Sequence, residues 1–122
     1  MKYLKLFFST FFALFFLHSC VNSENNTLII GNWQAIEWLV DGNISNRDVL
    51  STRFSFDAKN QYTFEYAGRK EKGTYKVEND MLFTTPEGET EMMVKIARLT
   101  KDTLVFNMNR GGQPELLTLI RK

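Results

Sequence analysis

The chain has 122 residues, of which 43% are hydrophobic and 24% charged, and its formal net charge is +1. A chain of this length can bury one core and no more. Because nucleic-acid binding depends on neutralising phosphates, a nearly neutral chain without a basic run is not expected to bind nucleic acid. A single cysteine excludes a disulfide framework within the chain.

The N-terminal segment has the pattern of an export signal. Two lysines precede an almost entirely apolar run at residues 6–17 that contains six phenylalanines. The run is shorter than the ~20 residues of a transmembrane helix. Leu17, Ser19 and Cys20 then resemble the cleavage box of bacterial lipoproteins. The resemblance implies a signal peptide at residues 1–19, cleavage after Ser19, and acyl chains such as palmitate on Cys20, which would anchor the protein stably to a membrane.

Cleavage would leave residues 20–122 with a formal charge of about −1, because two lysines are removed. Residues 20–27 are polar and lack periodicity, so we expect a lipidated Cys20 followed by a flexible tether, with the domain at 28–122. The expected location is the cell envelope. Val21 is not the Asp that retains some lipoproteins at the inner membrane, which favours the outer membrane. The alternative is an uncleaved N-terminal anchor in which Cys20 is an ordinary thiol.

Apolar and polar residues alternate through the rest of the chain, with a turn signal every eight to twelve residues. This pattern predicts eight strands, and residues 43–51 are expected to be a loop or a short helical turn. Sequential strands joined by short turns pair as antiparallel neighbours, and eight of them remove their exposed edges by closing into an up-and-down β-barrel. An open two-sheet sandwich is the alternative. The expected strands cover about 28–40, 53–57, 62–66, 73–78, 81–85, 91–97, 104–108 and 115–121.

Several short motifs are similar to those of the lipocalin-like domains of bacterial lipoproteins, which belong to the calycin-type small β-barrels. They are Gly31-x-Trp33 at the start of the first strand, Phe54-x-Phe56, Tyr62-x-Phe64, Gly73-x-Tyr75 and the segment 96–104. The resemblance implies an eight-stranded antiparallel barrel. It also implies that Gly31 and Trp33 help close one barrel end, with Arg121 of the last strand stacked on Trp33.

The interior of an eight-stranded barrel is either filled by side chains or holds one small ligand. A cavity of ~300 Å³ or more would favour the binding or carriage of a small hydrophobic molecule. A filled barrel would favour a structural or interaction protein that binds another envelope protein or acts as an inhibitor. The residues expected to line the lumen are Phe54, Phe56, Tyr62, Phe64, Tyr66, Tyr75, Met92, Val94, Phe106 and Met108, with Val77, Ile96 and Leu104 also pointing inward.

Trp38 lies five residues after Trp33 in the same expected strand. Strict alternation therefore places it on the outer face, unless a β-bulge intervenes. The alternative is a Trp38 that is partly buried under the loop at 43–51.

Residues that carry chemistry are sparse after the signal. The only histidine is His18, and an acylated Cys20 would have no free thiol, so we expect no His-dependent triad, Cys nucleophile, zinc site or cofactor. Paired carboxylates remain, but the candidates are expected at outward or turn positions, as solvated charges. The sequence therefore predicts a protein that is not an enzyme. The carboxylates considered are Glu65, Glu71, Glu78, Glu89 and Glu91.

Overall fold

The structure is a computed structural model that describes residues 23–122. The signal peptide expected at 1–19 and the lipidation expected at Cys20 lie outside the described residues. A short helix, α1 (Ser23–Leu28), precedes nine strands. The strands are β1 (Gly31–Val40), β2 (Asn43–Ile44), β3 (Arg53–Phe56), β4 (Gln61–Tyr66), β5 (Arg69–Glu78), β6 (Met81–Pro86), β7 (Met92–Leu99), β8 (Thr103–Arg110) and β9 (Gln113–Arg121).

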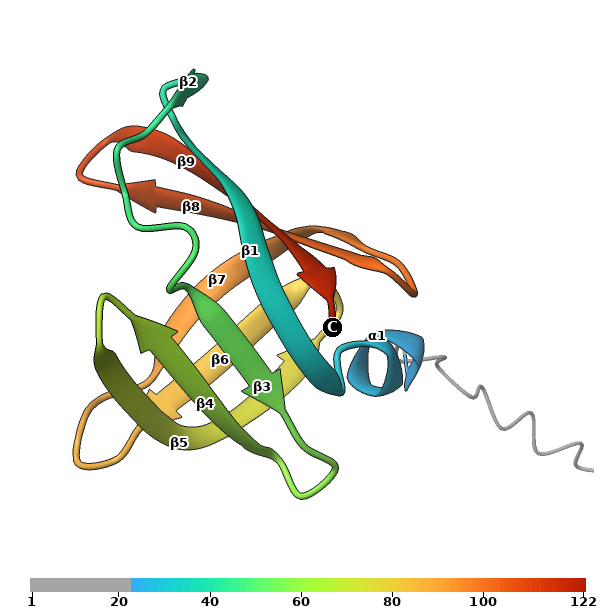
Figure 1. Cartoon of the computed structure of the whole chain (residues 1–122). Coiled ribbons are helices and arrows are strands. Elements are labelled where there is room, and N and C mark those ends of the chain that lie inside the picture. Colours follow the sequence, from blue (N-terminus) through green and yellow to red (C-terminus); the bar gives the residue numbers. More distant parts are fainter. Residues whose placement is uncertain (1–22) are drawn as a thin grey trace, which may run out of the picture.

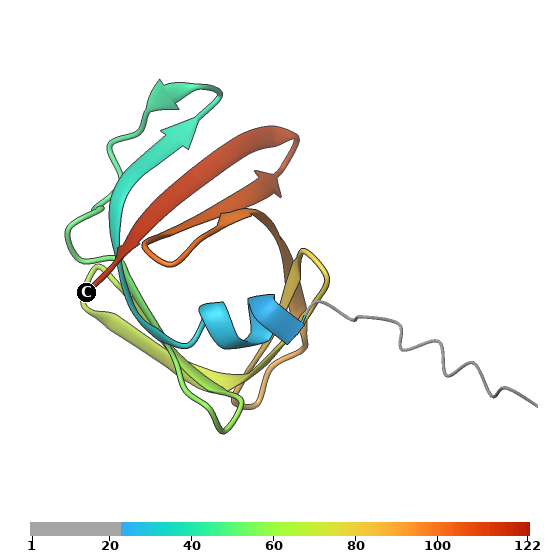
Figure 2. The same ribbon diagram turned by 90° about the vertical axis from the view of Figure 1, so that its right-hand side faces the viewer.

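Eight of these strands form a closed antiparallel barrel (Figures 1 and 2). Each strand from β3 to β9 pairs with the next one along the chain, and β1 pairs with both β3 and β9 to complete the ring. The two-residue β2 is added at the free end of β1. The predicted up-and-down barrel is thus confirmed, and the open sandwich is not formed.

The apolar half of each alternating strand forms the core. Buried side chains from β1, from β3 to β9 and from the residue after α1 make one cluster inside the barrel. The core comprises Ile29, Trp33, Ala35, Trp38, Phe56, Tyr62, Tyr75, Val77, Leu82, Ile96, Leu104, Phe106, Leu117 and Leu119.

In the part of the chain that the structure describes, no helix is long and apolar enough to cross a membrane.

A β-bulge in β1 overturns the outward placement of Trp38. The register against β9 shifts between Ala35 and Glu37, so that one extra residue, Ile36, is inserted there. Because side chains alternate with a period of two, an extra residue returns the next apolar side chain to the interior. Trp38 is consequently buried and only 3% exposed, whereas Ile36 is 53% exposed. Arg47, from the loop at 43–51, lies 5.0 Å from the centre of the Trp38 ring.

The helix α1 replaces part of the expected flexible tether. Residues 23–27 are helical rather than irregular, and Asn25 donates a hydrogen bond from Nδ2 to the Asn79 carbonyl at 2.7 Å. Ile29, directly after the helix, is completely buried. Such a short helix is not stable by itself, so these tertiary contacts hold it in place. It lies across one opening of the barrel (Figure 2).

Candidate functional site

The barrel end beside α1 is closed by Trp33 and Arg121. The guanidinium carbon of Arg121 lies 4.3 Å from the centre of the Trp33 ring, the contact that the resemblance implied. Trp33 donates its indole hydrogen bond to the Ile29 carbonyl at 2.8 Å. Arg121 also donates to the carbonyls of Leu28 at 2.5 Å, Ile30 at 2.6 Å and Lys101 at 2.7 Å. These contacts fasten α1 and the first strand to the last strand.

Gly31 is required by the same arrangement. Its φ angle is +137°, a conformation that side-chain-bearing residues rarely adopt. A Cβ atom placed there would lie 2.3 Å from Nη1 of Arg121. The three residues expected to close the barrel therefore do meet, and their contacts give them an architectural role.

The opposite half of the barrel contains a cavity of about 590 Å³. Every barrel strand contributes to its lining, and most of the lining lies toward the end opposite α1, in the later part of β1, the first half of β7 and β9, and the last half of β8. Met81, at the start of β6, is a lining residue closer to the α1 end. Seven of the ten expected lumen residues line it: Phe54, Tyr62, Phe64, Met92, Val94, Phe106 and Met108. Met92 stands at its rim, because its side chain is 50% exposed.

The remaining three expected lumen residues are placed differently. Phe56 and Tyr75 are buried in the core and do not line the cavity; their rings are 4.9 Å apart, edge to face. Tyr66 lies outside the cavity lining, and its ring is 5.8 Å from that of Trp38. The α1 half of the barrel is thus filled by side chains, and the other half is hollow.

Three phenylalanines form an aromatic wall of the cavity. The ring of Phe54 stacks on Phe64 at 4.5 Å and meets Phe106 edge to face at 5.4 Å. Such pairs add about 0.5–1.5 kcal/mol beyond the burial of their area. Leu82 and Leu117, which are both almost fully buried, extend the apolar lining. This surface suits an apolar ligand body.

A carboxylate also faces the cavity, which corrects the expectation for Glu71. This residue pairs with the inward-facing Phe64 across β4 and β5, and it lines the cavity instead of pointing outward. The Tyr62 hydroxyl donates a hydrogen bond to Oε2 of Glu71 at 2.8 Å. Burial, this hydrogen bond and the Glu71 charge raise the pKa of Tyr62 far above its usual value of 10.0. The alternation of Gly73 with Tyr75, followed back by two residues, would have placed Glu71 on the inner face.

Sequence reasoning missed the buried carboxylate of Glu115. It is 1% exposed and accepts a hydrogen bond from the indole of Trp38 at 3.0 Å. Arg47 lies 3.1 Å from one of its oxygens and Arg110 lies 3.8 Å from the other. Glu115 shares its strand face with Leu117, so the alternation of β9 indicated that Glu115 points inward. Its charged partners could not be inferred in this way, because they come from two other segments of the chain.

The cavity reaches the outer surface between β7 and β8. The pairing of these strands begins at Lys95 and Asn107, and the earlier part of β7 has no partner in β8. Residues of the outer face, including Met93 and Asn109, line the cavity together with inward-facing ones. The mouth of the barrel therefore extends into a slit along this side.

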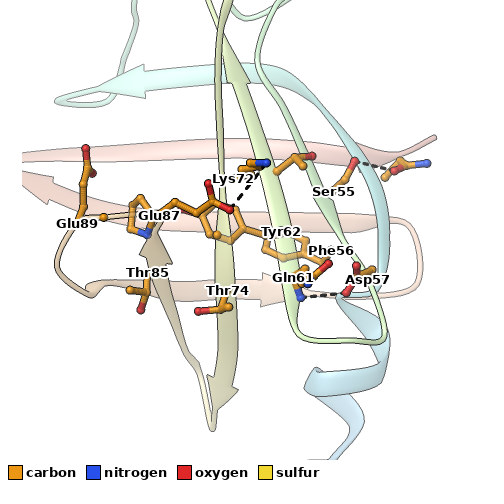
Figure 3. Close-up of a pocket in the computed structure, with 15 residues that line it drawn as sticks. Ser55, Phe56, Asp57, Gln61, Tyr62, Lys72, Thr74, Thr85, Glu87 and Glu89 are labelled. Carbon is orange, nitrogen blue, oxygen red and sulfur yellow. Dashed lines mark hydrogen bonds and ion pairs between the residues drawn. The ribbon is translucent and has the colours of Figure 1, made fainter.

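A second hollow, of about 570 Å³, follows β3 to β6 and the turn after β6 (Figure 3). Most of the residues that line it are polar, and several of their side chains bond to one another. Lys72 lies 3.8 Å from Glu87, and Ser55 donates to Asn32 at 2.7 Å. Because its polar side chains already bond to one another and its apolar lining is smaller than that of the cavity in the barrel, it is a weaker candidate for binding a hydrophobic ligand.

The arrangement of acidic residues does not suggest a metal centre. Among the residues that the structure describes, no three His, Cys, Asp or Glu side chains are grouped so that they could hold a metal ion. Glu65, one of the carboxylates considered above, is within 4 Å of both Arg53 and Lys70.

Comparisons with known proteins agree with this architecture. The chain is similar in structure to an uncharacterised protein from Bacteroides eggerthii, with a TM-score of 0.62 and 17% identity over 77% of this chain and 99% of that one. It is also similar to a lipocalin-like protein from Bacteroides uniformis, with a TM-score of 0.57 and 14% identity over 78% of this chain and 98% of that one. No curated protein matches the sequence. The family model of the lipocalin-like domain matches residues 29–106, and the chain therefore belongs to the lipocalin-like domain family.

Proposed function

We propose that this protein is a lipid-anchored protein of the bacterial cell envelope that binds one small hydrophobic molecule in the hollow half of its barrel. The cavity of about 590 Å³ carries the proposal. Binding sites for small molecules typically measure ~300–1,000 Å³, are mostly apolar and contain a few polar groups. The aromatic wall would hold the apolar body of the ligand, and Glu71 with Tyr62 would receive one hydrogen-bonding group.

The anchor in this proposal is an acylated Cys20. Its support is the N-terminal sequence: a charged start, an apolar run of signal length and the lipoprotein-type box before the cysteine. We expect mass spectrometry of the membrane-extracted protein to find acyl chains on Cys20, and the Cys20→Ser variant to leave the membrane fraction. An unmodified Cys20 would refute the anchor without affecting the proposal for the cavity.

Binding rather than catalysis is proposed because the carboxylate that lines the cavity, and the buried carboxylate bonded to Trp38 of its lining, are each held by protein contacts. Glu71 accepts the Tyr62 hydroxyl, and Glu115 is held by the Trp38 indole and two arginines. His18 is the only histidine of the chain. Hydrophobic ligand binding needs none of these groups to exchange a proton.

A matched pair of valine variants tests the cavity. Val94 lines it, whereas Val105 lies in β8 between the inward-facing Leu104 and Phe106 and faces outward. We expect Val94→Trp to weaken binding of the fluorescent probe N-phenyl-1-naphthylamine at least tenfold, equivalent to ~1.4 kcal/mol. Val105→Trp should leave the affinity unchanged. Equal affinities in both variants, with folding checked by circular dichroism, would refute binding in the cavity.

One observation favours a second candidate, recognition of another envelope protein. Ile44 and Leu50, in the segment between β1 and β3, are 84% and 82% exposed. Both side chains would be removed from water by a partner that covered this segment. A photo-crosslinking residue at position 44 would capture a specific partner in cells if this function holds, and an exposed position such as 98 serves as its control.

A further inference from the structure

We infer that the closed end of the barrel faces the lipid surface, and that the cavity mouth points away from it. This inference rests on the proposed acylation of Cys20. Its structural basis is the position of α1, which lies across the closed end and starts three residues after the cysteine (Figure 2). The anchor would therefore fix the orientation of the barrel as well as its location.

Contacts on several sides hold α1 against the barrel. Arg121 binds the carbonyls at the end of the helix, and Asn25 binds the turn between β5 and β6. The Ile29 side chain is completely buried, and the Ile29 carbonyl accepts a hydrogen bond from the Trp33 indole. Because the helix is fastened in this way, the first described residue, Ser23, belongs to the rigid end of the domain.

The length of the chain before α1 excludes an orientation with the mouth on the membrane. Three residues from Cys20 to Ser23 span at most ~11 Å when fully extended. The nine-residue β9, tilted by ~40°, spans about 23 Å along the barrel axis. The mouth lies at the far end of that distance, so its loops are out of reach of the surface when the barrel stands on it.

Charge on the outer wall does not favour a barrel lying on its side along β5. Lys70, Lys72 and Lys76 point from this strand, but each lies within 4 Å of a carboxylate. Paired lysines add little attraction for anionic lipids, which act on excess positive charge. An upright barrel instead leaves the mouth and the exposed Ile44 and Leu50 facing the aqueous compartment.

The orientation has a consequence for ligand exchange. A mouth directed away from the bilayer receives its ligand from the aqueous compartment or from a partner protein. The hydrophobic molecule would not enter directly from the lipids that hold the anchor.

Single cysteines labelled with a fluorophore test the orientation in the acylated protein. An acylated Cys20 leaves the introduced thiol as the only free one. We choose Asp80→Cys in the turn beside α1, Arg69→Cys in the hairpin between β4 and β5 at the opposite end of the barrel, and Asn107→Cys on the outer wall where the cavity reaches the surface, all exposed positions. The probe is a vesicle of phosphatidylcholine containing a nitroxide-headgroup lipid, which quenches labels close to the surface.

We expect quenching at position 80 to exceed quenching at 69 and 107 several-fold. A Gly/Ser linker of about ten residues inserted after Asn22 should remove this difference, because the tether would then reach ~45 Å. Equal quenching at all three positions, stronger quenching at 69 or 107, or a difference that survives the linker would overturn the inference. A protein that lacks acyl chains and does not bind the vesicles would refute the proposed anchor, and the orientation with it.

Discussion

Replacing Arg121 tests how much this one side chain, which closes the barrel end beside α1, contributes to the stability of the protein. Arg121→Ala removes three hydrogen bonds to backbone carbonyls and the contact with the Trp33 ring. At a net ~1 kcal/mol for each hydrogen bond and ~0.5–1 kcal/mol for the cation–π contact, we expect the free energy of unfolding to fall by about 3–4 kcal/mol. Small domains have ~5–15 kcal/mol in total, so this is a large fraction.

The assay is the urea unfolding of residues 20–122 carrying Cys20→Ser, with tryptophan fluorescence as the signal that reports unfolding. Arg121→Lys should recover only about 1 kcal/mol, because an ammonium group cannot reproduce the planar fork of guanidinium donors. Lys122→Ala, at an exposed position, is the control and should change stability by less than ~0.5 kcal/mol. A loss below ~1 kcal/mol in Arg121→Ala, or full recovery by lysine, would refute the closing role.

Three further predictions concern the core and the cavity. Gly73→Ala should destabilise the protein by ~1–3 kcal/mol in urea unfolding, because its Cβ would lie 2.0 Å from the Thr85 carbonyl oxygen; an unchanged midpoint would contradict the close approach of β5 and β6. Glu115→Ala should cost ~1–3 kcal/mol, since it leaves the buried Trp38 indole without its acceptor while Arg47 and Arg110 remain accessible to water, and a neutral result would show that the cluster is not formed. The pKa values of Tyr62 and Tyr75 are raised, chiefly by burial, so the folded state holds both phenolic protons more tightly than the unfolded chain does. The stability that these two protonated side chains contribute is complete below pH 10.0 and is lost as the pH rises above that value. Between pH 8 and pH 11, the free energy of unfolding should therefore fall less steeply in Tyr62→Phe than in the unsubstituted protein.

Alternation alone predicted the barrel because every strand buries one of its two faces. The hairpin turns also followed from local motifs in the sequence, whereas the contact of Arg121 with Trp33 was implied by the resemblance to lipocalin-like domains. The helix α1 did not, because its six polar-rich residues have no helical pattern of their own. It is formed through contacts with residues far along the chain, such as Asn79 and Arg121.

The candidate site was predicted in part. The aromatic wall follows from inward positions in β3, β4 and β8, but the volume left between these side chains depends on how they pack. Glu71 was assigned to the outer face because charged residues are usually solvated, although its position in the alternation indicated the interior.

The sequence by itself determined the strand order of a closed barrel, since a period of two and short turns allow few other arrangements. Only the tertiary structure decided that Trp38 turns inward, because a bulge depends on the register of two strands that are distant in sequence. Likewise, a carboxylate can be buried at Glu115 only because Arg47 and Arg110 are brought beside it by separate segments. Periodicity describes one strand at a time, whereas a bulge, a buried charge and a cavity are properties of several strands together.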